Sequence, residues 1–206
     1  MSLVQQFYQL QSTILNKISV LNGLPALAFR IYLAHVFWMA GTTKWNPFDS
    51  ESSLENTINW FGNTEWGLGL PFPELLAYLA WGAEYFGAIL LVFGLATRWI
   101  SIPLIITMLV AIFSVHLQHG WSAIASGANE EISSRMSAAI SILKEHGNYG
   151  WLKAKGDFVI LQNGIEFAFT YLLMLVSLVF TGGGNYLSVD YYLDRYFRKN
   201  IDGEAS

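Results

Sequence analysis

The sequence predicts an all-α integral membrane protein, a four-helix bundle with amphipathic surface helices. Of its 206 residues, 53% are hydrophobic and only 13% are charged, whereas charged residues make up about a quarter of an average soluble domain. Four apolar stretches are also close to the roughly 20 residues that a helix needs to cross the hydrocarbon core. Together these observations favour a membrane bundle over a soluble fold.

The first 24 residues predict an amphipathic helix on the membrane surface. Leu3, Phe7, Leu10 and Ile14 recur at helical spacing, and polar residues occupy the other side. A helix with one apolar and one polar face is typical of a segment that lies in the membrane interface.

The transmembrane domain is expected over residues 25–190. Its predicted spans are residues 25–45, 73–96, 99–119 and 158–181. The second and third are joined by a tight turn, which makes them antiparallel neighbours. The glycine run at 182–184 ends the fourth span, and a cytoplasmic tail is expected over residues 191–206.

Basic residues predict the orientation of the chain, because they concentrate in cytoplasmic loops. One side would carry Lys17, Arg98, Arg195, Arg198 and Lys199. The other side would carry the acidic first loop and the long third connection, which includes a second amphipathic helix. Both termini are therefore expected in the cytoplasm.

Composition excludes several kinds of chemistry. The chain has no cysteine, which excludes disulfide exchange, thiolate metal ligands and a cysteine nucleophile. Its net charge is −4 and no basic block is present, so nucleic acid is not an expected partner. The lipid bilayer is the partner that the composition does predict.

Three ionisable residues within the predicted spans are the first functional candidates. An ionisable group near the bilayer centre costs about 2.5–3.5 kcal/mol, so it usually faces a protein interior. Arg30 lies early in the first span, and His35 and Glu84 are expected near mid-depth. An Arg30–Glu84 ion pair and a Glu84–His35 contact are both compatible with these depths. Such a pair would either bind a ligand and handle protons or only fix the packing of the helices.

A second polar group is expected near the outer surface, as one pocket rimmed by tryptophans. Lys44 and Glu166 lie at span ends and are candidates for ligand binding or proton handling, although Lys44 could extend to the headgroups instead. Glu74, at the start of the second span, belongs to the same polar group. His116 and His119 are three residues apart and would share a helix face. They are candidate metal ligands, but two histidines are fewer than a usual zinc site needs and could equally cap the helix.

The order and spacing of several short motifs resemble the DoxX family of small membrane proteins. The matching residues are Arg30, Gly41-Thr42-Thr43-Lys44, Glu84, Gly87, Gly94, Arg98 and the stretch SIPLIITMLVAIFSVH. The resemblance extends over nearly all of residues 25–190. It implies a four-helix bundle in the bacterial inner membrane, sometimes associated with oxidoreductases that exchange electrons with quinone.

The chain is most similar to one branch of that family, marked by RIYLAHVFWMAG, WGLGLPFPELLAYLA, RWISIPLIITMLVAIF, NGIEFAFTYLLMLV and GGGNYLSVDYYL. This branch is associated with the maturation of copper-binding ribosomal peptides. The resemblance therefore implies an accessory protein with quinone as a candidate ligand, copper as a further candidate, and a peptide-modifying enzyme or modified peptide as partner. Two alternatives stay open: a membrane subunit of a quinone-linked oxidoreductase acting on a sulfur compound, and a non-catalytic scaffold.

Overall fold

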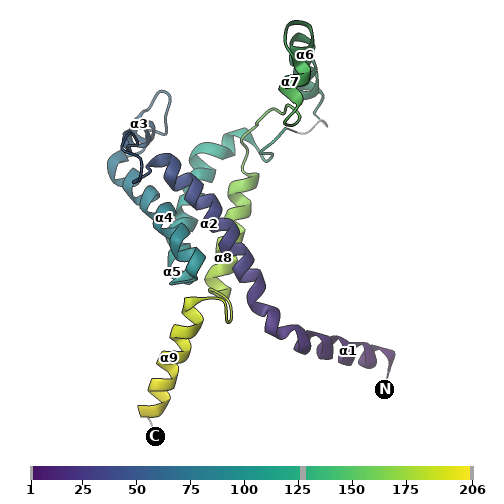
Figure 1. Cartoon of the computed structure of the whole chain (residues 1–206), viewed down its shortest axis with the longest axis vertical. Coiled ribbons are helices and arrows are strands. Elements are labelled where there is room, and N and C mark those ends of the chain that lie inside the picture. The colour runs from purple at the N-terminus through teal and green to yellow at the C-terminus, as the bar shows by residue number, and fades with distance from the viewer. Residues whose placement is uncertain (1, 126–128, 205–206) are drawn as a thin grey trace. The chain divides into compact units, whose positions relative to one another are not determined.

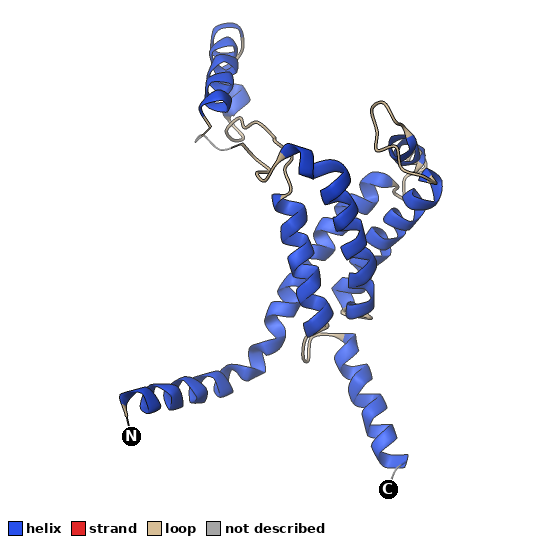
Figure 2. Ribbon diagram, turned by 180° about the vertical axis from the view of Figure 1, so that it is seen from behind, coloured by secondary structure: helices blue, strands red, loops and turns tan. Residues whose placement is uncertain are grey.

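The structure is a computed structural model that describes residues 2–125 and 129–204. Within these residues every regular element is a helix, and the only sheet-like pairing is an isolated bridge between Ile124 and Leu161 (Figure 2). The predicted all-α class is confirmed. Met1 of the expected N-terminal helix and residues 205–206 of the expected tail lie outside the described residues.

Figure 1 labels the helices in chain order. They are α1 (Leu3–Ile18), α2 (Leu24–Lys44), α3 (Glu55–Gly62), α4 (Pro73–Phe93), α5 (Thr97–Ala111), α6 (Glu130–His146), α7 (Tyr149–Lys153), α8 (Glu166–Thr181) and α9 (Val189–Glu204). A 3₁₀ turn, Ser19–Gly23, joins α1 to α2, and α5 continues into a π-helical turn, Ile112–His116, and a 3₁₀ turn, Leu117–His119.

The chain divides into two compact units. The first comprises residues 1–107 and 172–206, and the second comprises residues 108–171. The first unit contains α1 to α4, the start of α5, most of α8 and all of α9. The second contains the end of α5, the long connection with α6 and α7, and the start of α8.

Three helices are long and apolar enough to cross a membrane: Leu21–Lys44, Pro73–Phe93 and Thr97–His119. The fourth apolar helix, α8, is shorter than the stretch 158–181 predicted from hydropathy, because it begins only at Glu166. The residues before it pair with another segment instead. The amide N–H groups of Gln162 and Gly164 donate to the carbonyls of Ala123 and Ser122, both at 3.0 Å.

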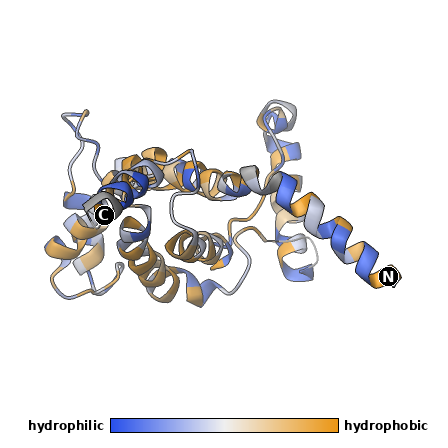
Figure 3. Cartoon of the chain, turned by 90° about the horizontal axis from the view of Figure 1, so that it is seen from below, coloured by the Kyte–Doolittle hydropathy of each residue, from blue (hydrophilic) through white to orange (hydrophobic). Residues whose placement is uncertain are grey.

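The amphipathic segments are helical as expected. Ser2 and Gln5 cap the start of α1 reciprocally: the Gln5 amide donates to Ser2 Oγ and the Ser2 amide donates to Gln5 Oε1. Figure 3, where N marks the free end of α1, shows hydrophobic and hydrophilic residues alternating along this helix. Its apolar side chains, Leu3 and Phe7 among them, are exposed. The segment expected as a cytoplasmic tail forms the amphipathic helix α9 over Val189–Glu204.

Small residues let α2 and α4 approach closely, as their sequences predict. Ala34 of α2 and Ala77 and Ala88 of α4 are buried. A Cβ on Gly41 would stand 3.0 Å from the backbone nitrogen of Tyr85. Because the backbones meet at this point, Gly41 and Tyr85 define the level at which α2 passes α4.

The short helix α3 is held against α4 by an apolar cluster. Leu54, Phe61 and Ala77 are buried in it, and Trp45 and Ile58 pack around them. The Trp81 indole, on α4, also donates a hydrogen bond to the Trp45 carbonyl at 2.9 Å. These contacts fix α3 beside the end of α2, where it lines the pockets described below.

Candidate functional site

Arg30 is 1% exposed and holds four backbone carbonyls, an arrangement we call the Arg30 clamp. Its Nε donates to the Leu91 carbonyl at 2.8 Å and its Nη2 donates to the Val92 carbonyl at 2.8 Å. Its Nη1 donates to the carbonyls of Gly183 and Leu187, at 2.5 and 2.9 Å. The guanidinium therefore joins the end of α4 to the loop between α8 and α9.

The partners of Arg30 explain how a cation is tolerated there. Leu91 and Val92 lie in the last turn of α4, where carbonyls have no partner within the helix and the helix dipole is negative. A guanidinium offers five N–H donors in a planar fork, so it can bind several carbonyls that diverge in direction. The site is a structural junction of three segments.

The predicted Arg30–Glu84 ion pair is wrong. Glu84 is 2% exposed and pairs with Lys44, whose Nζ donates to Glu84 Oε2 at 2.6 Å. Both Arg30 and Glu84 do point into the protein, as expected. Each, however, has found a different partner: Arg30 binds carbonyls at one end of α2, and Glu84 binds the lysine at the other end.

The error came from the relative depths assigned to the helices. Because Tyr85 lies opposite Gly41, Glu84 is level with the last turn of α2 and not with His35. His35 lies six positions before Gly41, or roughly 9 Å along the helix axis. The expected Glu84–His35 contact is therefore also wrong, and the His35 side chain is exposed.

Lys44 does not extend to the headgroups but turns back to Glu84. Its side chain is 21% exposed, against 3% for Glu84, because one side of it lines a pocket of about 430 Å³. This Lys44 pocket is lined by Met39, Ala40, Thr43, Lys44, Thr57 and Trp60. Thr43 donates its hydroxyl to the Met39 carbonyl. The lysine ammonium, the Thr57 hydroxyl and the Trp60 indole N–H are the side-chain donors of the lining that remain for a ligand.

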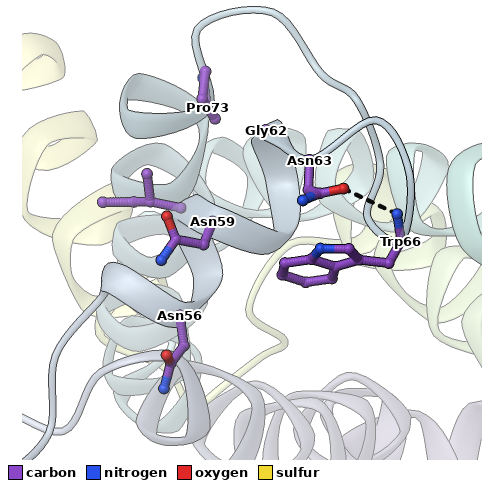
Figure 4. A pocket seen from close by; sticks show the side chains of 7 residues that line it. Asn56, Asn59, Gly62, Asn63, Trp66 and Pro73 are labelled. Carbon is purple, nitrogen blue, oxygen red and sulfur yellow. Dashed lines mark hydrogen bonds between the residues drawn. The ribbon is translucent and has the colours of Figure 1, made fainter.

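A larger pocket, of about 640 Å³, lies on another side of α3. Figure 4 shows Asn56 and Asn59 on α3 and Asn63 directly after its end, with the indole of Trp66 nearby. Asn63 Oδ1 accepts a hydrogen bond from the Trp66 amide at 2.9 Å, which fixes the turn that carries the indole. This asparagine pocket has no charged residue in its lining and was not anticipated from the sequence.

The remaining predicted site residues lie in the second unit. Glu166 begins α8, and its Oε2 accepts the amide N–H of Ala123 at 3.0 Å. The Nδ1 atom of His116 is 2.8 Å from the Asn163 carbonyl, a contact that requires the proton on Nδ1. His119 is exposed. Glu166 and His116 therefore both contact the backbone near the start of α8 and the end of the third span.

The predicted metal pair, His116 and His119, does not sit on a regular α-helix. His116 ends a π-helical turn and His119 ends a 3₁₀ turn, so the α-helical spacing rule does not apply to them. Among the residues that the structure describes, no group of three or more histidine, aspartate or glutamate side chains is arranged to hold a metal ion. Metal binding by the two histidines stays a prediction.

Asp190, in the first turn of α9, is a structural residue that sequence reasoning missed. Its carboxylate accepts the amide N–H groups of Ala96 and Thr97, at 2.7 and 2.8 Å, and so caps α5 from another helix. An aspartate in a first helical turn is normally assigned to its own helix. Only the return of α9 to the start of α5 shows its role.

Replacing Gly94 with alanine should break the Arg30 clamp. Gly94 has a φ of +63°, and a Cβ there would stand 2.7 Å from both Nη atoms of Arg30. The left-handed backbone alone costs a residue with a side chain about 1–2 kcal/mol, and the clash adds to this. We expect the detergent-solubilised variant to unfold at a clearly lower temperature. Gly82→Ala, on the same helix with nothing within 4 Å of the new Cβ, is the matched control, and an equal loss in both variants would contradict the clamp.

Comparison with known proteins finds a family model that matches part of the chain. The DoxX family model matches residues 26–117, a shorter range than the resemblance in the sequence had suggested. An uncharacterized protein of Haemophilus influenzae is 30% identical over 110 residues, which cover 52% of this chain and 66% of that protein. A Bacillus subtilis protein named "Putative oxidoreductase CatD" is 32% identical over 92 residues, which cover 45% of this chain and 60% of that protein.

The matched part of this chain thus spans somewhat less than two thirds of either relative's length. No solved structure matches the chain. The matched range contains Arg30, Lys44 and Glu84, so the buried ion pair lies inside it. Two of the carbonyls that Arg30 holds, those of Gly183 and Leu187, lie outside it. Residues 26–117 are similar to the DoxX family, and three helices of the described chain are long and apolar enough to cross a membrane.

Proposed function

We propose that this chain is a membrane accessory protein that binds a quinone in the Lys44 pocket and supports the maturation of a copper-binding peptide. The observation that carries the proposal is the buried Lys44–Glu84 pair with one side of the lysine open to a pocket of about 430 Å³. An apolar cavity with a few convergent polar groups is the usual form of a small-ligand site. The similarity to the DoxX family and the name of the Bacillus subtilis relative support a link to oxidoreduction.

The lining of the Lys44 pocket fits a quinone. Lys44 has donors beyond the one used by Glu84, and Thr57 offers a hydroxyl, so both can donate to ring carbonyls. Met39 and Ala40 supply apolar surface, and the Trp60 indole suits stacking on a flat ring. A bound quinone would accept electrons from a partner protein together with protons.

Within this proposal Lys44 orients the ligand and Glu84 positions Lys44. The Glu84 carboxylate balances the charge of the ammonium, which allows a cation to remain at this depth, and it fixes Nζ at 2.6 Å. Positioning a donor before the ligand arrives lowers the entropic cost of binding. The same pocket would serve the alternative function, a membrane subunit of a quinone-linked oxidoreductase acting on a sulfur compound.

A peptide partner is favoured by a separate observation, the asparagine pocket. The side-chain amides of Asn56 and Asn59 make no hydrogen bond with the described residues. Each offers a donor and an acceptor, which together match the N–H and C=O of an extended peptide. The uncharged lining and the Trp66 indole suit a neutral segment of such a chain. We assign this pocket to the modified peptide.

The proposed location is the bacterial inner membrane with both termini in the cytoplasm. In the first unit Arg98 and the basic residues of α9 lie at the Arg30 end of α2, whereas the acidic loop before α3 follows its Lys44 end. Cytoplasmic loops are the ones enriched in basic residues.

Loss of the Lys44 ammonium should weaken quinone binding. A hydrogen bond to a charged group contributes about 1.5–3 kcal/mol, so we expect Lys44→Met to raise the Kd for a short-chain ubiquinone by at least about tenfold. Equilibrium dialysis with the purified protein measures this. Lys153→Met removes an exposed lysine in α7 and is the control. An unchanged Kd in a folded Lys44→Met protein would refute the quinone site.

A photoreactive amino acid at position 59 should capture peptide in cells of the source organism. We expect adducts whose mass spectra identify a ribosomal peptide, because Asn59 faces the asparagine pocket. The same amino acid at Ser137, exposed on α6, should give none. Adducts of lipid or sugar at position 59 in place of peptide would argue against the assignment.

The orientation can be tested because the chain has no native cysteine. Ser53→Cys should react with a membrane-impermeant maleimide in intact cells, since the acidic loop would face outward. Asn200→Cys, in α9, should react only after the inner membrane is permeabilised. The reverse pattern would place both termini outside.

A further inference from the structure

A third pocket lies at the Arg30 end of the first unit, away from Lys44. It has a volume of about 400 Å³ and is formed by the start of α5, the loop between α8 and α9, and one face of α9. Its lining includes Arg98, Trp99, Gly182, Gly183, Asp194 and Arg198. We call it the Arg98 pocket.

One cation in the lining, Arg98, has no counterion among the residues that the structure describes. Asp190 is engaged by the amides of Ala96 and Thr97, and Asp194 accepts a hydrogen bond from Arg198 Nε at 2.8 Å. Arg98 forms neither a hydrogen bond nor an ion pair with any residue that the structure describes. The two acidic groups of the pocket are thus already used, and Arg98 leaves a positive charge at its wall.

Arg98 lies beside the loop of Gly182, Gly183 and Gly184, which we call the glycine loop. Its Nε is 3.1 Å from the position that a Cβ would take on Gly182. Because the glycines carry no side chains, the pocket wall is open backbone beside a guanidinium. A phosphate oxygen can approach such a surface closely, and a guanidinium binds phosphate through two parallel hydrogen bonds.

The pocket lies at the level where lipid headgroups would be. It opens between the end of one candidate span, Pro73–Phe93, and the start of the next, Thr97–His119. Trp99 is 76% exposed beside it, and exposed tryptophan is typical of the membrane interface. The α9 helix, which forms one wall, exposes Tyr192, Tyr196 and Phe197 in an amphipathic pattern that suits the same interface.

We propose that the Arg98 pocket binds the phosphodiester of a phospholipid headgroup. The phosphate pairs with Arg98 over the glycine loop, and the acyl chains follow the apolar surface of the adjoining spans. The headgroup thereby stabilises the glycine loop, in which the Gly183 carbonyl accepts a hydrogen bond from Arg30 Nη1 at 2.5 Å. The lipid and the Arg30 clamp would thus both stabilise the loop between α8 and α9.

The test measures lipid retention by the full chain. Protein purified in detergent is titrated with dioleoyl phosphatidylglycerol, and bound lipid is counted by native mass spectrometry. A basic residue near an anionic membrane surface contributes about 1 kcal/mol, so we expect Arg98→Gln to weaken binding about fivefold. Arg98→Lys, which keeps the charge but loses the fork, should fall between the two.

Arg135→Gln removes an exposed arginine of α6 and should leave lipid binding unchanged. Equal binding by the natural chain and Arg98→Gln would overturn the proposal, as would an equal loss in Arg135→Gln. Inorganic phosphate in the titration should not displace the lipid. If millimolar phosphate displaces it completely, the pocket is a site for free anions and the lipid assignment fails. The melting temperature of each variant confirms that it is folded.

Discussion

The burial of the Arg30 guanidinium among backbone carbonyls is the constraint on which the first unit depends. A cation in an apolar bundle must be hydrogen-bonded, because an unpaired buried charge is too costly to persist. The described hydrogen bonds of Arg30 all go to backbone carbonyls, two at the end of α4 and two in the loop after α8, rather than to a carboxylate. One side chain thus satisfies several backbone groups at once, and it holds segments together that are far apart in the chain.

The two ends of α2 differ in how many hydrogen-bond donors they leave for a ligand. At the Arg30 end four of the five guanidinium N–H groups donate to backbone carbonyls, so little remains for a ligand. At the Lys44 end the ammonium has one strong partner, Glu84, and one open side. A charged group that is fixed but not fully enclosed can bind a ligand, which is why the proposed function is centred on Lys44.

The sequence indicated the fold class, the amphipathic helices and most of the buried ionisable residues. It failed on their pairing, since depth was judged from position within each span. Because α4 packs against α2 with Tyr85 opposite Gly41, Glu84 lies level with Gly41 rather than with His35. The sequence also placed the start of α8 too early. The residues before Glu166 are not helical and instead form backbone hydrogen bonds with the segment around Ala123. Neither effect leaves a local pattern in the sequence.

Hydropathy and helical periodicity are properties of neighbouring residues, so the chain alone determined that these segments are helices, that they are membrane helices, and that Arg30, Lys44 and Glu84 are exceptional within them. The partner of each charge, the cap that Asp190 provides for α5 and the three pockets were decided by the tertiary structure. Each of these depends on how far one helix is displaced along another. That displacement is set by packing at points such as Gly41 against Tyr85, and no single segment encodes it.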